Sequence, residues 1–209
     1  MRFLVKWLKP FILSIIKLIR GGKVKKVIPD NISANELLIR GIFTPLFYST
    51  SKQKLKEGAF LPPPNKNDVS ILRHDYSNDN ACKNHCLRVN IKDNLYCGLS
   101  TFLASHISEL SIKYEIKNAV YLRYTPLEDD FNTQIEKRPV YTTDRGVPMH
   151  ADIYYEGEFE AYKPQTKFRR FAKDLAQNIS IYFADPNPLL QSWSGEKLSW
   201  NSNNISNNK

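Results

Sequence analysis

The chain has 209 residues, of which 42% are hydrophobic, 12% aromatic and 24% charged, and this composition is typical of one folded domain with its own core. The net charge is +9, but eight of the 30 Lys and Arg residues lie in residues 1–26, which hold no acid, leaving 22 basic against 21 acidic groups. The body is therefore nearly neutral. That balance argues against a nucleic-acid partner, because a duplex-binding domain needs a basic face of its own.

The first 20 residues, MRFLVKWLKPFILSIIKLIR, separate basic from apolar side chains when they are placed on a helix. The basic side chains fall within an arc of about 80°. They are Arg2, Lys6, Lys9, Lys17 and Arg20, and the opposite face includes Trp7, Phe11 and Ile15. This pattern predicts an amphipathic helix that lies in the plane of an anionic membrane surface.

Two other interpretations of this segment stay open. Residues 10–16 are the longest run without a charge, whereas a spanning helix needs about 20 mostly apolar residues. Lys9 and Lys17 would still permit a span if their side chains reached toward the interface. The apolar face could instead pack on protein. A secretion signal is disfavoured because lysines interrupt the apolar stretch and no small-residue cleavage site follows it.

Residues 27–190 are expected to form one α+β domain, with a small, mostly antiparallel sheet and flanking helices. Ser33 and Glu36 form a capping-box pattern, which predicts a short helix in ANELL. Alternation and β-branched or aromatic content predict the strands. These are VSILR (69–73), LYCGLSTF (95–102), YEIKNAVYLRY (114–124) and HADIYYEGEFEAY (150–162), the last as a hairpin around Glu156-Gly157.

Two further helices are predicted in the body. One is polar and covers residues 77–87. The other is QTKFRRFAKDLAQN (165–178), where Phe168, Phe171, Ala172, Leu175 and Ala176 recur at helical spacing. The Asn- and Ser-rich end, residues 191–209, is expected to be a disordered tail.

Cysteine usage indicates a reducing compartment. Cys82, Cys86 and Cys97 are odd in number, which argues against a secreted disulfide framework and favours the cytoplasm. Zinc is the alternative, because His74 and His85 lie close by in the sequence. Cys-x3-Cys followed by a single Cys is not a usual ligand spacing. We therefore expect ordinary thiols and no metal site.

Several short motifs resemble those of a group of small bacterial proteins of unknown function. They are LLIRGI, GAF, VSILR and MHADIYY, followed by a basic helix that contains AKDLA, and they cover residues 33–178. The resemblance implies a compact domain in which Arg40, Ser70, Arg73 and His150 recur together. It implies no activity.

The order LIRG, FYSTSK, EGEFE is also similar to the Arg…Ser-Thr-Ser…Glu-x-Glu order of ADP-ribosyltransferases. That resemblance implies that Arg40 and residues 49–51 shape a pocket for nicotinamide adenine dinucleotide (NAD). Glu160, two residues after Glu158, would hold the ribose and stabilise the positive charge that develops on it. Residues 49–51 follow Arg40 too closely for separate strands, whereas Ser70 restores the spacing but loses Ser-Thr-Ser.

These patterns together predict a cytoplasmic bacterial protein, held peripherally at an anionic membrane by residues 1–26, that binds an unidentified protein partner and needs no cofactor. The alternative is an NAD-dependent, ADP-ribosyltransferase-like enzyme. Its catalytic residues would be Arg40, Ser70, Glu158 and Glu160, with Arg73 and His150 as further candidates for a site. Arg40 follows an apolar run, so we expect its guanidinium to need a ligand phosphate, an internal carboxylate or strand carbonyls as partner.

Overall fold

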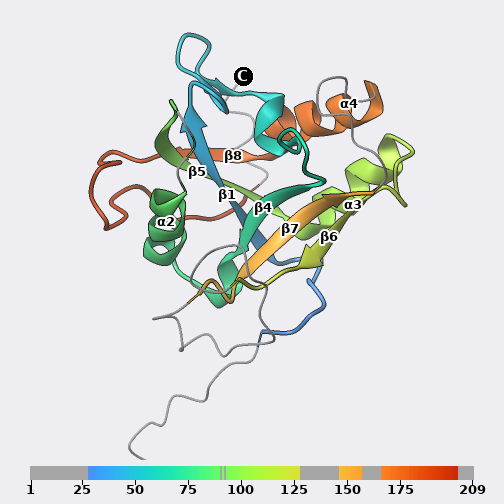
Figure 1. Ribbon diagram of the computed structural model, residues 1–209, viewed down its shortest axis with the longest axis horizontal. Coiled ribbons are helices and arrows are strands. Elements are labelled where there is room, and N and C mark those ends of the chain that lie inside the picture. The colour runs from blue at the N-terminus through green and yellow to red at the C-terminus, as the bar shows by residue number, and fades with distance from the viewer. Residues whose placement is uncertain (1–27, 90, 92, 128–145, 157–165, 202–209) are drawn as a thin grey trace, which may run out of the picture.

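The computed structural model describes residues 28–89, 91, 93–127, 146–156 and 166–201. The predicted N-terminal amphipathic helix lies outside these residues. Within them, six strands form one antiparallel sheet in the order β6-β7-β4-β1-β5-β8 (Figure 1). The strands are β1 (Leu37–Thr44), β4 (Asp68–Arg73), β5 (Leu95–Leu103), β6 (Val120–Tyr124), β7 (His150–Tyr155) and β8 (Ile181–Ala184). The predicted α+β class with a mostly antiparallel sheet is confirmed.

Three α-helices pack on this sheet in the described part of the chain, and a small hairpin extends β1. The helices are α2 (Asp79–Arg88), α3 (Ala104–Lys113) and α4 (Thr166–Asp174), the last continued by a π-helical turn, Leu175–Ile179. The hairpin joins β2 (Tyr48–Ser49) and β3 (Lys54–Leu55). Short 3-10 turns, Glu57–Phe60 and His74–Tyr76, flank β4.

One face of the sheet carries the main apolar core. Opposite residues in paired antiparallel strands share a face, and side chains alternate between faces along each strand. Val69 and Ile71 of β4 therefore lie beside their partners Ile153 and Ala151 of β7, and all four are buried. Tyr155 of the same face packs edge-on against two rings of α4, Phe168 and Phe171, at centroid distances of 5.6 and 6.2 Å. We call this the core face.

Helix α2 covers the other face, over β1 and β5. A Cβ atom added at Gly41 would lie 2.5 Å from Cys86 Sγ, so the close approach of α2 requires glycine at this position. Asn78 begins the helix, because its side chain accepts from the Ala81 N–H at 2.9 Å. This confirms the helix predicted for residues 77–87.

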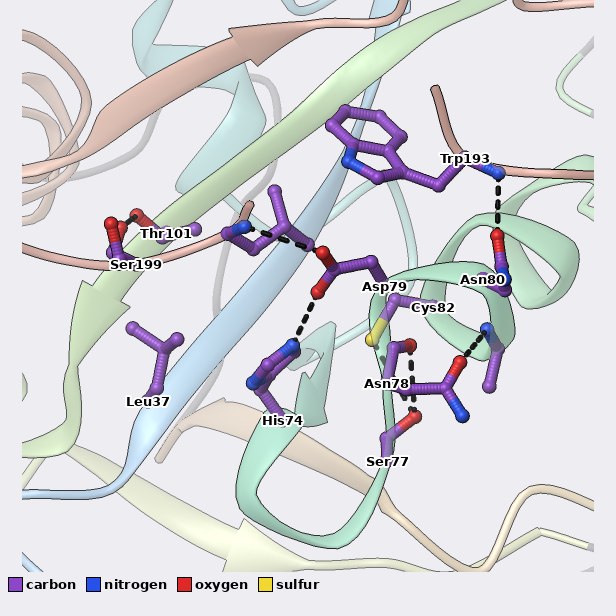
Figure 2. A network of polar contacts seen from close by, with 12 residues as sticks. Leu37, His74, Ser77, Asn78, Asp79, Asn80, Cys82, Thr101, Trp193 and Ser199 are labelled. Carbon is purple, nitrogen blue, oxygen red and sulfur yellow. Dashed lines mark hydrogen bonds and ion pairs between the residues drawn. The ribbon is translucent and has the colours of Figure 1, made fainter. Parts of the chain in front are cut away.

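Residues 191–201 pack on the body, unlike the expected tail. In Figure 1 this C-terminal segment, drawn in red, runs beside α2. Figure 2 shows the Trp193 N–H donating to the Asn80 side chain at 2.6 Å. The Ser199 carbonyl accepts from Thr101 Oγ1 of β5 at 2.7 Å in the same view. Leu198 is 2% exposed.

A buried lysine of α2 contacts the chain just before this segment and at its start. Lys83 of α2 is fully buried, and three oxygen atoms lie within 3.0 Å of its Nζ. They belong to the Asp185 carboxylate at 2.6 Å, the Asn187 carbonyl at 2.8 Å and the Ser192 carbonyl at 3.0 Å. The two carbonyl contacts are hydrogen bonds and the Asp185 contact is an ion pair, so the buried charge is matched by an opposite charge and two acceptors.

The helix predicted in ANELL is wrong. One of the two contacts of a capping box forms, since the Ser33 N–H donates to Glu36 Oε2 at 3.4 Å, whereas the Glu36 N–H donates to the Ser33 main-chain carbonyl at 3.0 Å. The chain then enters β1 at Leu37. Leu38 pairs with Arg73 of β4 and with Phe102 of β5, and pairing on both sides outweighs the weak local preference.

Candidate functional site

Arg40 links β1 to β4 and to the 3-10 turn Glu57–Phe60. Its guanidinium donates from Nε to the Ala59 carbonyl at 3.0 Å and from an Nη to the Ser70 carbonyl at 2.7 Å. It also lies over the Phe47 ring, 4.9 Å from the centroid. Burial lowers its pKa to about 10, which leaves it charged at neutral pH. Of the partners expected for Arg40, the structure shows strand and turn carbonyls.

Arg73 ties the segment before β1 to the end of β4. It is fully buried and forms a two-point ion pair with Glu36, one contact of which measures 2.9 Å. An Nη donates to the Pro29 carbonyl at 2.5 Å. The rings of Tyr76 and Tyr124 lie 4.7 and 5.0 Å from the guanidinium carbon. All of these contacts hold the fold together.

The serines named with Arg40 do not gather around it. Arg40 reaches the Ser70 carbonyl, whereas the Ser70 side chain lies on the opposite face of the sheet, the face it shares with its partner Asp152. Ser49 lies in the exposed hairpin, with its hydroxyl 3.3 Å from that of Ser51. Glu158 and Glu160 lie outside the described residues.

His150 belongs to a buried polar cluster at the start of β7. Its Nδ1 lies 2.7 Å from the Thr125 carbonyl oxygen, and a carbonyl only accepts, so Nδ1 carries the proton. The Thr125 hydroxyl donates to Asp152 Oδ2 at 2.6 Å. His150 Nε2 faces the other carboxylate oxygen, Asp152 Oδ1, at 3.8 Å, which is beyond hydrogen-bond distance.

Burial keeps the imidazoles of this cluster neutral. It lowers the pKa of His150, although the Asp152 carboxylate and the Thr125 carbonyl oppose the shift. Burial likewise lowers the pKa of His85 on α2 to about 3, and the two rings meet edge-on with centroids 6.0 Å apart. The pKa of Asp68 is raised, first by burial and then by the Asp152 carboxylate.

His150, Asp152 and Asp68 form part of a polar patch on the face opposite the core face. The strand register places Ser70, Asp152 and Arg123 in one row, and Asp68, Tyr154 and Tyr121 in the next. The patch consists of those six residues and His150. Asp152 is only 7% exposed, whereas Arg123 is exposed and lies over the Tyr154 ring, 4.6 Å from its centroid. Among the described residues, Asp152 Oδ1 has no hydrogen-bond partner.

None of the three cysteines belongs to this polar patch. Cys82 and Cys86 are buried on α2 and Cys97 is half-buried on β5, and none forms a disulfide. Burial raises the pKa of Cys86 to about 12 and that of Cys82 further still. Figure 2 shows the Cys82 thiol donating to Ser77 Oγ at 3.6 Å. Within the described ranges, no three His, Cys, Asp or Glu side chains gather as a metal site would require.

Sequence reasoning named His150 but missed Asp152, Thr125 and Asp68. The period-two pattern of HADIYY was the available signal, because it places His150, Asp152 and Tyr154 together on one face. Thr125 could not be found in this way, since only the pairing of β6 with β7 brings it to His150.

In the part of the chain that the structure describes, no helix is long and apolar enough to cross a bilayer. Comparisons with protein-family models, curated protein sequences and solved structures found no match. The function is therefore inferred from the residues of this chain alone.

Proposed function

We propose that this chain is a peripheral membrane protein whose nearly neutral folded body binds a protein partner. One observation carries the proposal, which is the segregation of charge. Residues 1–26 hold eight basic residues and no acid, together with Trp7 and Phe11. Near an anionic surface each basic residue contributes about 1 kcal/mol, and the aromatic and aliphatic side chains add a contribution that does not depend on salt.

The contacts of the two candidate arginines favour binding over ADP-ribosyl transfer. The enzyme alternative needs a guanidinium that meets a phosphate of NAD. Arg40 already donates to two main-chain carbonyls, and Arg73 is fully buried in its ion pair with Glu36. Releasing either arginine for a ligand would leave buried acceptors without their donors, which is costly.

The experiment compares full-length variants in a vesicle sedimentation assay. Lys6→Gln/Lys9→Gln/Lys17→Gln removes three charges from residues 1–26. The matched control, Lys52→Gln/Lys54→Gln/Lys66→Gln, removes three exposed charges from the body. We expect the first variant to lose at least tenfold in affinity for vesicles that contain phosphatidylserine, and the control to bind like wild type.

Two further readings complete the test. Wild-type binding should weaken as salt rises, because surface electrostatics are screened, and Trp7→Ala/Phe11→Ala should weaken binding even at high salt. Equal loss in both charge variants, or wild-type sedimentation that ignores anionic lipid, would refute the proposal.

A further inference from the structure

The polar patch holds two buried hydrogen-bond acceptors that face each other without a donor between them. With its proton on Nδ1, the neutral His150 ring presents a lone pair at Nε2. Asp152 Oδ1 lies 3.8 Å from that nitrogen and has no hydrogen-bond partner among the described residues. Leaving a buried polar atom unsatisfied costs about 1–3 kcal/mol, so the pair forms a ready site for a donor.

Charged groups of both signs surround this pair of acceptors. Asp68 lies on the same face of the sheet, one row from Asp152. Arg123 is the basic residue in register with Asp152, and its guanidinium lies over Tyr154. Arg40 is committed to carbonyls on the core face. Arg40 and Lys66 also interact electrostatically with these carboxylates, so the charges around the pair are close to balanced, and the two acceptors themselves, which only a donor can satisfy, decide the kind of ligand.

Aromatic rings border the same patch. Tyr121 and Tyr154 lie side by side with ring centroids 5.4 Å apart. Tyrosine faces attract cations through their quadrupole, and Arg123 already uses the ring of Tyr154 in this way. On the same face, Asp68 and Ser70 are half-buried, whereas His150 and Asp152 are buried.

We propose that the polar patch binds a primary ammonium group, held by Asp152 Oδ1 and His150 Nε2. A nitrogen about 2.9 Å from each acceptor would lie between them. The third hydrogen of an ammonium group can be accepted by the Asp68 carboxylate or the Ser70 hydroxyl on the same face. The ligand is either a small aliphatic amine or a lysine side chain of a protein. This site does not depend on the proposed membrane attachment.

The experiment uses the full-length protein labelled with ¹⁵N at histidine. n-Butylammonium is titrated while the Nε2 chemical shift of His150 is followed. Tetramethylammonium, which has the charge but no N–H, is the matched probe. We expect a saturable shift with n-butylammonium and none with tetramethylammonium. No saturable shift, or an equal response to both probes, overturns the proposal, the first outcome indicating a bridging water.

A variant tests the same acceptors independently. Asp152→Asn places an amide N–H₂ toward His150 Nε2 and so supplies the missing donor from within. We expect at least tenfold weaker n-butylammonium binding in this variant, with the fold retained by circular dichroism. Asp93→Asn, at an exposed turn position with a φ of 59°, is the control and should bind like wild type. Unchanged affinity in Asp152→Asn overturns the proposal. If that variant does not fold, the wild-type titration decides alone.

Two probes distinguish the sources of the ammonium group. Tighter binding of putrescine than of N-acetyl-lysine methylamide identifies a small amine, and the reverse order identifies a protein lysine. Either order supports the ammonium site, and failure of both probes counts against it.

Discussion

Two buried charged clusters flank α2, and they differ in how completely their polar atoms are matched. Lys83 has three oxygen atoms within 3.0 Å, all from residues 185–192; among them Asp185 Oδ2 forms no hydrogen bond to a described residue but lies 2.6 Å from the ammonium nitrogen as an ion pair. Asp152 has one oxygen bonded to Thr125 and the other unmatched among the described residues. Natural folds satisfy nearly all their buried polar groups, and exceptions often mark functional positions. This difference supports a structural role for the Lys83 cluster and the ammonium-binding role proposed above for the Asp152 cluster.

The largest expected effect comes from removing the matched charge. Lys83→Met should lower the free energy of unfolding by about 3–5 kcal/mol, because Asp185 would remain buried without its partner. Urea denaturation of the full chain measures the change. Lys173→Met, on the exposed side of α4, is the control and should change stability by less than about 0.5 kcal/mol. A similar small loss in Lys83→Met would remove the distinction between the two clusters.

The next largest effect is expected for Arg40, a second charged residue whose donors are matched by acceptors. Arg40→Ala should destabilise the fold by about 3 kcal/mol, since hydrogen bonds from a charged donor contribute about 1.5–3 kcal/mol each. NAD should not raise the melting temperature of the wild type. The enzyme alternative predicts the opposite result. Arg40→Ala would fold normally, and wild type would release nicotinamide from NAD, an activity that Glu160→Gln would lose.

The neutral imidazoles predict how stability depends on pH. The pKa of His85 is about 3 in the fold and about 6.5 in an unfolded chain. Below pH 6.5 the unfolded chain therefore binds the proton that the fold excludes, and the free energy of unfolding falls as pH drops toward 3. Each such histidine contributes at most about 1.4 kcal/mol per pH unit.

Thermal denaturation between pH 7 and pH 4 measures this slope. His85→Asn should make it shallower, because the variant lacks the proton-binding group that burial disfavours. An unchanged slope in His85→Asn would mean that His85 binds its proton equally well in the folded and unfolded chain, which would contradict the lowering of its pKa by burial.

The smallest expected effect on the body is that of removing residues 1–26. The contacts that hold the two clusters join described residues between Lys83 and Ser192. The truncated protein should therefore keep its unfolding free energy within about 1 kcal/mol of the full chain and should no longer sediment with anionic vesicles. Loss of folding, or retained vesicle binding, would show that the segment is part of the body.

Alternation and residue type predicted β4, β5, β6 and α2 because their sequences agree locally with their final structures. ANELL failed because Glu36 is used by Arg73, 37 residues away, and no local pattern reveals such a partner. Residues 191–201 pack on the body although Asn and Ser dominate the composition of this end, because Leu198 and Trp200 supply the packing; residues 202–209 of the expected tail lie outside the described residues. Trp200 donates to the Ile179 carbonyl at 2.9 Å and stacks on His106.

The candidate site could be predicted from the sequence only in part. His150 was identified from a short motif, but the chemistry of its ring depends on Thr125 and on Asp152. The unmatched oxygen of Asp152 depends in turn on strand register. The residue types can be read from the sequence, whereas the pairing of individual donors and acceptors depends on the three-dimensional fold.

The contacts of Lys83 also bear on how the protein is synthesised. Helix α2 leaves the ribosome long before Asn187 and Ser192, so its ammonium group must stay in water until almost the whole domain has emerged. The contacts of Lys83 are therefore complete only after residue 192 has left the ribosome, and from that point α2 can close over the sheet with its charge paired. A message truncated before codon 185 would produce a chain with an uncompensated lysine at its centre, a ready substrate for cellular proteolysis.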